Sequence, residues 1–185
     1  FDLSLQHVSP PVLKAMGRWG SRERFERIIS RIRLADPLAG VRSTFILGFP
    51  GETDEEAAEV ESFVNDADLD WVGVFGYSRE PGTRSHDLPG QVPEVITRER
   101  VERVSSAGDR TMERRARSLV DRRFEVLVDR YDLAEKAWVG RSRREAPEVD
   151  GEIRFSSEAN LSVGQYVDVL ITGSDGADLL GRHPF

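Results

Sequence analysis

Hydrophobic positions in the first 78 residues follow strand and helix patterns in alternation. The segments 1–7, 41–47 and 71–78 have the alternating or continuously apolar pattern of strands. Between them, apolar residues recur at helical spacing after Ser21 and again after Thr53, which predicts two amphipathic helices. Helical connections of this kind join parallel strands, so the first part is predicted to be α/β. Three parallel strands cannot close an eight-stranded β/α barrel, but they can form part of one.

A glycine-rich turn follows the strand at 41–47. It has two glycines around a proline, and Thr53 then stands at the N-cap of the next helix, where Glu56 completes a capping box. Ligands bind at such corners because backbone N–H groups and helix N-termini converge there. The corner is not a P-loop, since Glu52 occupies the place of the P-loop lysine and would repel a phosphate. An ordinary turn without a ligand is the alternative.

The pattern changes in the second half of the chain. A long helix is predicted to begin at Thr97, and acidic residues interleaved with its arginines favour a salt-bridged surface over an RNA-binding one. After residue 122, short strands separated by turn residues predict a small antiparallel barrel. The predicted fold class is therefore α/β followed by all-β, with domains at 1–122 and 123–185. The predicted barrel strands are 124–128, 137–140, 151–155, 166–172 and a segment around Leu179 and Leu180.

Composition narrows the functions that this chain can perform. It has 185 residues, no cysteine and a formal net charge of −7. The lack of cysteine excludes disulfides, thiolate zinc sites and iron–sulfur ligation by this segment. The negative charge argues against broad nucleic-acid binding. No apolar run is long enough to span a bilayer and no signal peptide opens the chain, so we expect a cytoplasmic protein. Because the chain starts inside a strand without methionine, we expect it to be a piece of a longer protein.

The histidines give only a weak indication of chemistry. His7 lies at the end of the first predicted strand, while His86 and His183 are far away along the chain. The three are not spaced as metal ligands. A lone histidine at a strand end is more often a hydrogen-bonded structural group than a catalytic one. From the residues alone, the sequence supports a small-molecule pocket at three strand ends.

Three motifs, in order and spacing, resemble the second half of the radical-SAM domain of methylthiotransferases. They are Leu5-Gln6-His7, the segment Arg42 to Thr53 and the segment Val72 to Thr83. Within that family, Gly140-Arg141-Ser142 and the segment 146–151 most resemble the branch that modifies an aspartate of a ribosomal protein (RimO). The resemblance covers nearly the whole chain. It implies the second half of a partial, TIM-like β/α barrel followed by a TRAM domain, which is an OB-like barrel.

The same resemblance implies the cofactors. S-adenosylmethionine and two [4Fe–4S] clusters are expected in the full-length enzyme, with the cluster cysteines upstream of Phe1. No catalytic or metal-binding residue is expected in this chain, and the chain alone is expected to be inactive. Arg42 has two interpretations, a contact to a carboxylate of cofactor or substrate and an ion pair on the barrel rim. The cofactor-binding residues implied by the family motifs are Gln6, His7, Arg42, Thr44 (a departure from the family's leading glycine), Ile46 and Gly48.

The implied substrate is an aspartate of the small-subunit ribosomal protein at the decoding centre. From Arg117 onward the chain has ten basic and thirteen acidic residues, a balance that attracts a basic protein and repels phosphate. Glu145, Glu148 and Asp150 (with Glu152) are therefore the expected docking residues, although they fit a solvated loop equally well. The alternatives are a tRNA methylthiotransferase and a non-enzymatic RNA- or ribosome-binding adaptor.

Overall fold

The computed structural model describes residues 1–184 and has an α/β part followed by a closed β-barrel. The chain divides into two units, residues 1–111 and 112–185. Residues 112–122, which the sequence analysis assigns to the first domain, group with the second unit, and the boundary after residue 122 stays a prediction. No helix among the described residues is long and apolar enough to cross a membrane.

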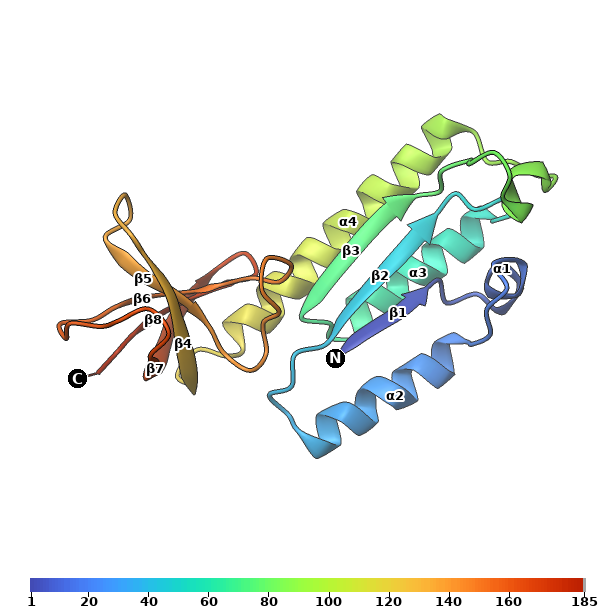
Figure 1. Ribbon diagram of the computed structural model, residues 1–185. Helices are drawn as coiled ribbons and strands as arrows, with labels where there is room; N and C mark the ends of the chain where they lie inside the picture. The colour runs from blue at the N-terminus through green and yellow to red at the C-terminus, as the bar shows by residue number, and fades with distance from the viewer. Residues whose placement is uncertain (185) are drawn as a thin grey trace. The chain divides into compact units, whose positions relative to one another are not determined.

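The first unit is built on a three-stranded parallel sheet in the order β1-β2-β3, whose arrows point the same way in Figure 1. Its strands are β1 (Asp2–Gln6), β2 (Arg42–Leu47) and β3 (Trp71–Gly76). The helices are α1 (Pro10–Ala15), α2 (Arg22–Ala35), α3 (Asp54–Asp66) and α4 (Glu94–Arg117), and a 3-10 turn, η1, spans Arg84–Asp87. The predicted β-α-β-α-β order is thus confirmed.

Residues of β2 alternate between a covered face and an open face of the sheet. Ser43, Phe45 and Leu47 are buried, and the last two belong to the core that also contains residues of α2, α3 and α4. The residues between them, Thr44 and Ile46, alternate onto the other face and are half-buried. Helices therefore pack on one face of the sheet, which leaves the side of Thr44 and Ile46 for other contacts.

Two helix starts agree with the sequence and one does not. The Ser21 hydroxyl accepts from the backbone N–H of Arg24, and Thr53 and Glu56 form the predicted capping box. Helix α4, however, begins at Glu94 and not at Thr97. The N–H of Thr97 donates to the carbonyl of Pro93 over 3.0 Å, so the helical hydrogen bonds already start at the proline. Proline is well tolerated at a helix start because it lacks an N–H that would need a partner.

The second unit is a closed five-stranded barrel in the order β4-β5-β6-β8-β7. Four of its strand pairs are antiparallel, as predicted, and β6 and β8 add one parallel pair that the sequence analysis did not foresee. Parallel pairing arises because β7 and β8 form a hairpin and β8 then closes the barrel against β6. A five-stranded closed barrel of this kind is OB-like, as predicted. The strands are β4 (Arg123–Asp132), β5 (Ala137–Arg141), β6 (Ile153–Ser156), β7 (Tyr166–Asp175) and β8 (Asp178–Arg182).

Candidate cofactor cavity and docking surface

A cavity of about 480 Å³ opens at the carboxyl ends of the three parallel strands. Gln6 ends β1, Ile46 lies near the end of β2, and Tyr77 directly follows β3. Ligands bind at this edge of parallel sheets, and it is where the sequence predicts a small-molecule pocket. The other lining residues come from the end of α1 and from the loops after β2 and β3: Ala15, Met16, Gly17, Arg18, Phe49, Arg84 and Ser85.

Apolar and hydrogen-bonding groups share the wall of this cavity. Ile46 and Phe49 supply apolar surface, and the Phe49 ring meets the Tyr77 ring edge-on at 5.2 Å between centroids. The Tyr77 hydroxyl is buried and has no hydrogen-bond partner among the described residues. An unpaired buried hydroxyl costs about 1–3 kcal/mol, so a polar group that reached the Tyr77 hydroxyl would be stabilising.

Gln6 reaches the cavity through an unusual backbone. Its φ is +67°, in the left-handed region that non-glycine residues rarely adopt. The pairing of β1 with β2 also shifts register between Leu3 and Gln6. Such a conformation costs of order 1 kcal/mol and typically occurs at functional sites. Because the end of β1 is irregular, Gln6 lines the cavity whereas the next residue, His7, is buried in the protein interior.

His7 lies in the protein interior and does not line the cavity. It is completely buried, and its Nδ1 accepts from the N–H of Ser9 over 3.0 Å. Since Nδ1 is an acceptor, the proton sits on Nε2, which lies 3.4 Å from the Glu52 carboxylate. The structure therefore favours the hydrogen-bonded structural role over a cofactor contact for His7.

Glu52 is the hub of a buried network behind the glycine turn. Its two carboxylate oxygens accept from the N–H of Gly48 at 2.9 and 3.0 Å. The Arg100 guanidinium donates to the same carboxylate at 2.8 Å and to Asp54 at 2.6 Å. The Gly48 N–H is thereby used within the protein, and Glu52 faces inward where it repels nothing at the cavity.

The sequence analysis interprets the arginines of the long helix together as a salt-bridged surface, and for Arg100 this is wrong. Arg100 is only 6% exposed. A signal was present in the spacing: Arg100 lies four residues before Val104, and both share a face with the buried residues Ala107 and Thr111. An arginine in a buried stripe needs an acidic partner, and Glu52 lies far away along the chain.

Gly48 is required by its backbone and by a neighbour, but it does not line the cavity. Its φ is +79°, and a Cβ added there would come within 2.2 Å of the Thr97 hydroxyl on α4. The space beside Gly48 is thus occupied by the protein itself. Thr44 lies on the open face of β2, two residues before Ile46, but is not among the cavity-lining residues.

Arg42 lies at the other end of β2 from the cavity. It is the first residue of the strand, and its guanidinium is 2.5 Å from the carboxylate of Asp2, the first residue of β1. The cavity is at the opposite, carboxyl ends of these strands. Of the six residues expected to bind the cofactor, the structure therefore brings Gln6 and Ile46 together at the cavity, and the Arg42 ion pair matches the second interpretation of that residue.

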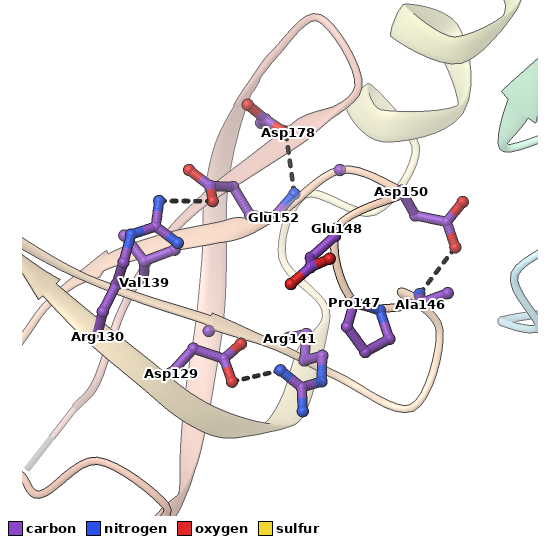
Figure 2. A pocket seen from close by; sticks show the side chains of 12 residues that line it. Asp129, Arg130, Val139, Arg141, Ala146, Pro147, Glu148, Asp150, Glu152 and Asp178 are labelled. Carbon is purple, nitrogen blue, oxygen red and sulfur yellow. Dashed lines mark hydrogen bonds and ion pairs between the residues drawn. The ribbon is translucent and has the colours of Figure 1, made fainter.

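The barrel carries a second cavity, of about 530 Å³, shown in Figure 2. Two arginines line it, and both are paired: Arg130 with Glu152 at 2.8 Å, and Arg141 with Asp129. Acidic residues outnumber them, so the cavity has a net negative lining. Its acidic members are Asp129, Glu148, Asp150, Glu152 and Asp178.

The acidic residues expected to dock the substrate are only partly at the surface. Glu145 is buried, and its carboxylate accepts from the N–H and hydroxyl of Ser142 at 2.8 and 2.7 Å. This corrects the expectation that Glu145 offers its charge to a partner. Asp150 accepts from the N–H of Ala146 at 2.8 Å and so stabilises the loop. Glu148 is exposed and lines the cavity, which makes it the best-placed charge for a partner.

The family comparison identifies this barrel. A model described as TRAM domain matches residues 120–183, which include all five barrel strands. Residues 120–183 are a TRAM domain. The sequence analysis predicted this domain from the family resemblance, and its strands are those of the observed barrel.

Curated relatives match the chain over nearly its whole length. Proteins named ribosomal protein uS12 methylthiotransferase RimO from Streptomyces avermitilis and Cutibacterium acnes are each 44% identical to it, and the alignments cover 98% of this chain and 37% of each relative. The RimO of Geobacter sulfurreducens is 39% identical over 98% of this chain and 40% of its own length. The resemblance to RimO is confirmed. The chain spans well under half of the relatives that it matches.

Two arginines lower the pKa of one carboxylate of the TRAM domain, that of Glu152. Burial alone would raise the pKa of Glu152, but hydrogen bonds from Arg130 and Arg154 outweigh it and lower the pKa below its ordinary value. Glu152 is therefore ionised at neutral pH and bound by two cations, so it contributes less to a free acidic surface than Glu148 does.

The donor set of the chain does not fit an iron–sulfur cluster. There is no cysteine in the sequence, and the described residues contain no group of three or more His, Asp or Glu side chains placed to hold a metal ion. The cavity at the strand ends, in contrast, has the size and the mixed polarity of a small-molecule site, for which about 300–1,000 Å³ is typical.

Proposed function

We propose that this chain forms part of the cofactor cavity and the substrate-docking barrel of a radical S-adenosylmethionine methylthiotransferase. The full-length enzyme would attach a methylthio group to the β-carbon of an aspartate in the small-subunit ribosomal protein at the decoding centre. The observation that carries this proposal is the similarity to RimO along 98% of the chain, because the names of those relatives specify ribosomal protein uS12.

The cavity at the strand ends is the proposed S-adenosylmethionine site. When bound beside a reduced cluster, this cofactor supplies the radical that removes hydrogen from the substrate carbon. In this chain, Ile46 and Phe49 offer apolar surface for the adenine, and Gln6 and Tyr77 offer hydrogen-bonding groups. The cluster ligands would come from outside this chain, as the lack of cysteine requires.

The TRAM domain is the proposed docking site for the protein substrate. Its acidic balance, with Glu148 at the cavity of Figure 2, favours a basic ribosomal protein over nucleic acid. Nucleic-acid affinity depends mainly on cationic contacts to phosphates, which an acidic surface opposes. Electrostatic attraction of this kind steers association and weakens with salt.

A titration of the chain 1–185 tests the docking proposal. Labelled uS12 and labelled tRNA are titrated separately with the chain, and fluorescence anisotropy is read at low and moderate salt. We expect uS12 to bind more tightly, with an affinity that falls as salt rises. Glu148→Lys should weaken uS12 binding, while Glu158→Lys, an equally charge-reversing change at another exposed acid of the TRAM domain, should weaken it much less.

Tighter binding of tRNA than of uS12 would overturn the docking proposal and favour the tRNA-modifying branch or an RNA-binding adaptor. Equal losses for the two lysine variants would remove Glu148 as a specific contact. The enzymatic proposal is tested with the full-length protein by mass spectrometry of uS12. The aspartate should gain the mass of a methylthio group, whereas the chain 1–185 alone should give no product.

A further inference from the structure

The cavity at the strand ends is positively charged in an otherwise acidic protein. The chain has 33 acidic and 26 basic residues, yet two arginines and no acid line this cavity. The arginines are Arg18, three residues after the end of α1, and Arg84, in η1. A lining with donors and no carboxylate is suited to an anion.

The two arginines differ in how far they are already engaged. Arg18 donates from Nη1 to the carbonyl of Ser4 over 3.0 Å, which ties it to β1. Arg84 is exposed, and it forms no ion pair or side-chain hydrogen bond among residues 1–184. Its guanidinium is therefore available for a ligand at the cavity mouth.

The turn that carries Arg84 is held in place by its own loop. The side-chain amide of Gln91 donates to the carbonyls of Ser85, His86 and Leu88 at 3.1, 3.3 and 3.0 Å. Arg79 also donates to the carbonyl of His86 at 2.8 Å. These bonds fix the backbone of η1, so the position of Arg84 is preorganised before a ligand binds.

We propose that Arg84 binds a carboxylate in this cavity. A guanidinium matches a carboxylate with two parallel hydrogen bonds, and Tyr77, whose buried hydroxyl has no partner among the described residues, lines the same cavity. The inference rests on the proposed function, which brings two carboxylates to this mouth: that of the methionine part of the cofactor and that of the target aspartate. Arg84 thus has the role that the sequence analysis considered for Arg42, which is paired with Asp2 at the far end of the sheet.

Binding measurements on the full-length protein distinguish the two carboxylates. Arg84→Gln and Arg84→Lys are compared with Arg31→Gln, a matched change of an exposed arginine on α2. Equilibrium dialysis gives the affinity for S-adenosylmethionine. Anisotropy gives the affinity for a uS12 segment containing the target aspartate and for the same segment with asparagine in its place. Circular dichroism verifies that the variants are folded.

We expect Arg84→Gln to weaken binding of one carboxylate by about tenfold or more, the effect typical of a hydrogen bond to a charged group. Weaker cofactor binding assigns Arg84 to the methionine carboxylate. Loss of the preference for aspartate over asparagine, with cofactor affinity unchanged, assigns it to the substrate. Arg84→Lys should recover only part of the affinity because it lacks the planar fork.

The inference is overturned if the wild-type protein binds both ligands and Arg84→Gln changes neither affinity nor the preference for aspartate. An equal loss in Arg31→Gln would overturn it too, because general charge would then explain the effect. A wild-type protein that binds neither S-adenosylmethionine nor the uS12 segment refutes the proposed function itself, and the inference with it.

Discussion

The guanidinium of Arg100 lies 2.8 Å from the carboxylate of Glu52, and both side chains are withdrawn from solvent. The same carboxylate accepts from Gly48 and lies 3.4 Å from His7. This ion pair therefore joins α4 to the turn after β2 and to the residue that follows β1. Its contacts lie at His7, the residue after Gln6, and at Gly48, two residues after Ile46, so the pair lies close in sequence to two residues that line the cavity.

Removing one partner of this pair should destabilise the chain strongly. Arg100→Met keeps the length of the side chain but leaves Glu52 buried without its cation, and we expect a loss of about 3–5 kcal/mol in the free energy of unfolding. Urea-induced unfolding measures it. Arg98→Met breaks the exposed pair with Glu94 and should cost under about 1 kcal/mol. Similar small losses in both variants would contradict the network.

Local patterns in the sequence predicted local structure well. The capping box of Thr53 and Glu56 was predictable because its two partners are three residues apart. The partners of Glu52 were not, because Arg100 and His7 are brought to it only by the packing of α4 and β1. The same holds in the TRAM domain, where Glu145 reads as one of a run of surface acids but is buried against Ser142.

Family motifs located the edge of the sheet that carries the cavity, but not each side chain. Alternation along β2 places Ile46 and Thr44 on the open face, yet it could not show that Arg42 lies at the opposite end of the strand from the cavity and is paired with Asp2. Arg84 was missed because it lies in a loop that has no periodic pattern. Only the three-dimensional path of that loop brings it to the cavity that Tyr77 also lines.

Two glycines of the same turn should respond differently to alanine. Gly48 and Gly51 both have positive φ, at +79° and +87°, so each substitution carries a backbone cost of about 1–2 kcal/mol. A Cβ at Gly51 meets nothing within 4 Å, whereas one at Gly48 meets Thr97. We therefore expect Gly48→Ala to lower the unfolding free energy clearly more than Gly51→Ala. Equal effects in urea unfolding would show that Thr97 moves aside freely.

Acid should weaken the TRAM domain in part through Glu152. Its pKa is lowered in the folded state, where Arg130 and Arg154 donate to it, relative to an ordinary value of 4.5. The resulting stability is fully present above about pH 4.5 and is lost as the pH falls through the folded pKa. Glu152→Gln should flatten this part of the pH profile of thermal unfolding. The exposed Glu158→Gln is the control, and a profile unchanged in Glu152→Gln would contradict the prediction.

Tyr77→Phe should preserve the stability of the free protein but weaken its binding of a ligand. In the chain 1–185, the substitution removes a buried hydroxyl that has no partner among the described residues, so the melting temperature should stay the same or rise. The ring and its edge-on contact with Phe49 are kept. In the full-length protein, affinity for S-adenosylmethionine or for the uS12 segment should fall by about two- to tenfold, because a ligand acceptor loses its donor.

The combination of these two measurements separates a ligand-binding hydroxyl from a structural one. Tyr166→Phe, at an exposed tyrosine of the TRAM domain, is the control and should change neither quantity. A clear drop in melting temperature for Tyr77→Phe would mean that the hydroxyl has an internal partner in solution. Unchanged affinity for both ligands would mean that the cavity wall around Tyr77 is not where they bind. Tyr77 is supported as a donor to the ligand only if Tyr77→Phe keeps the melting temperature and lowers the ligand affinity.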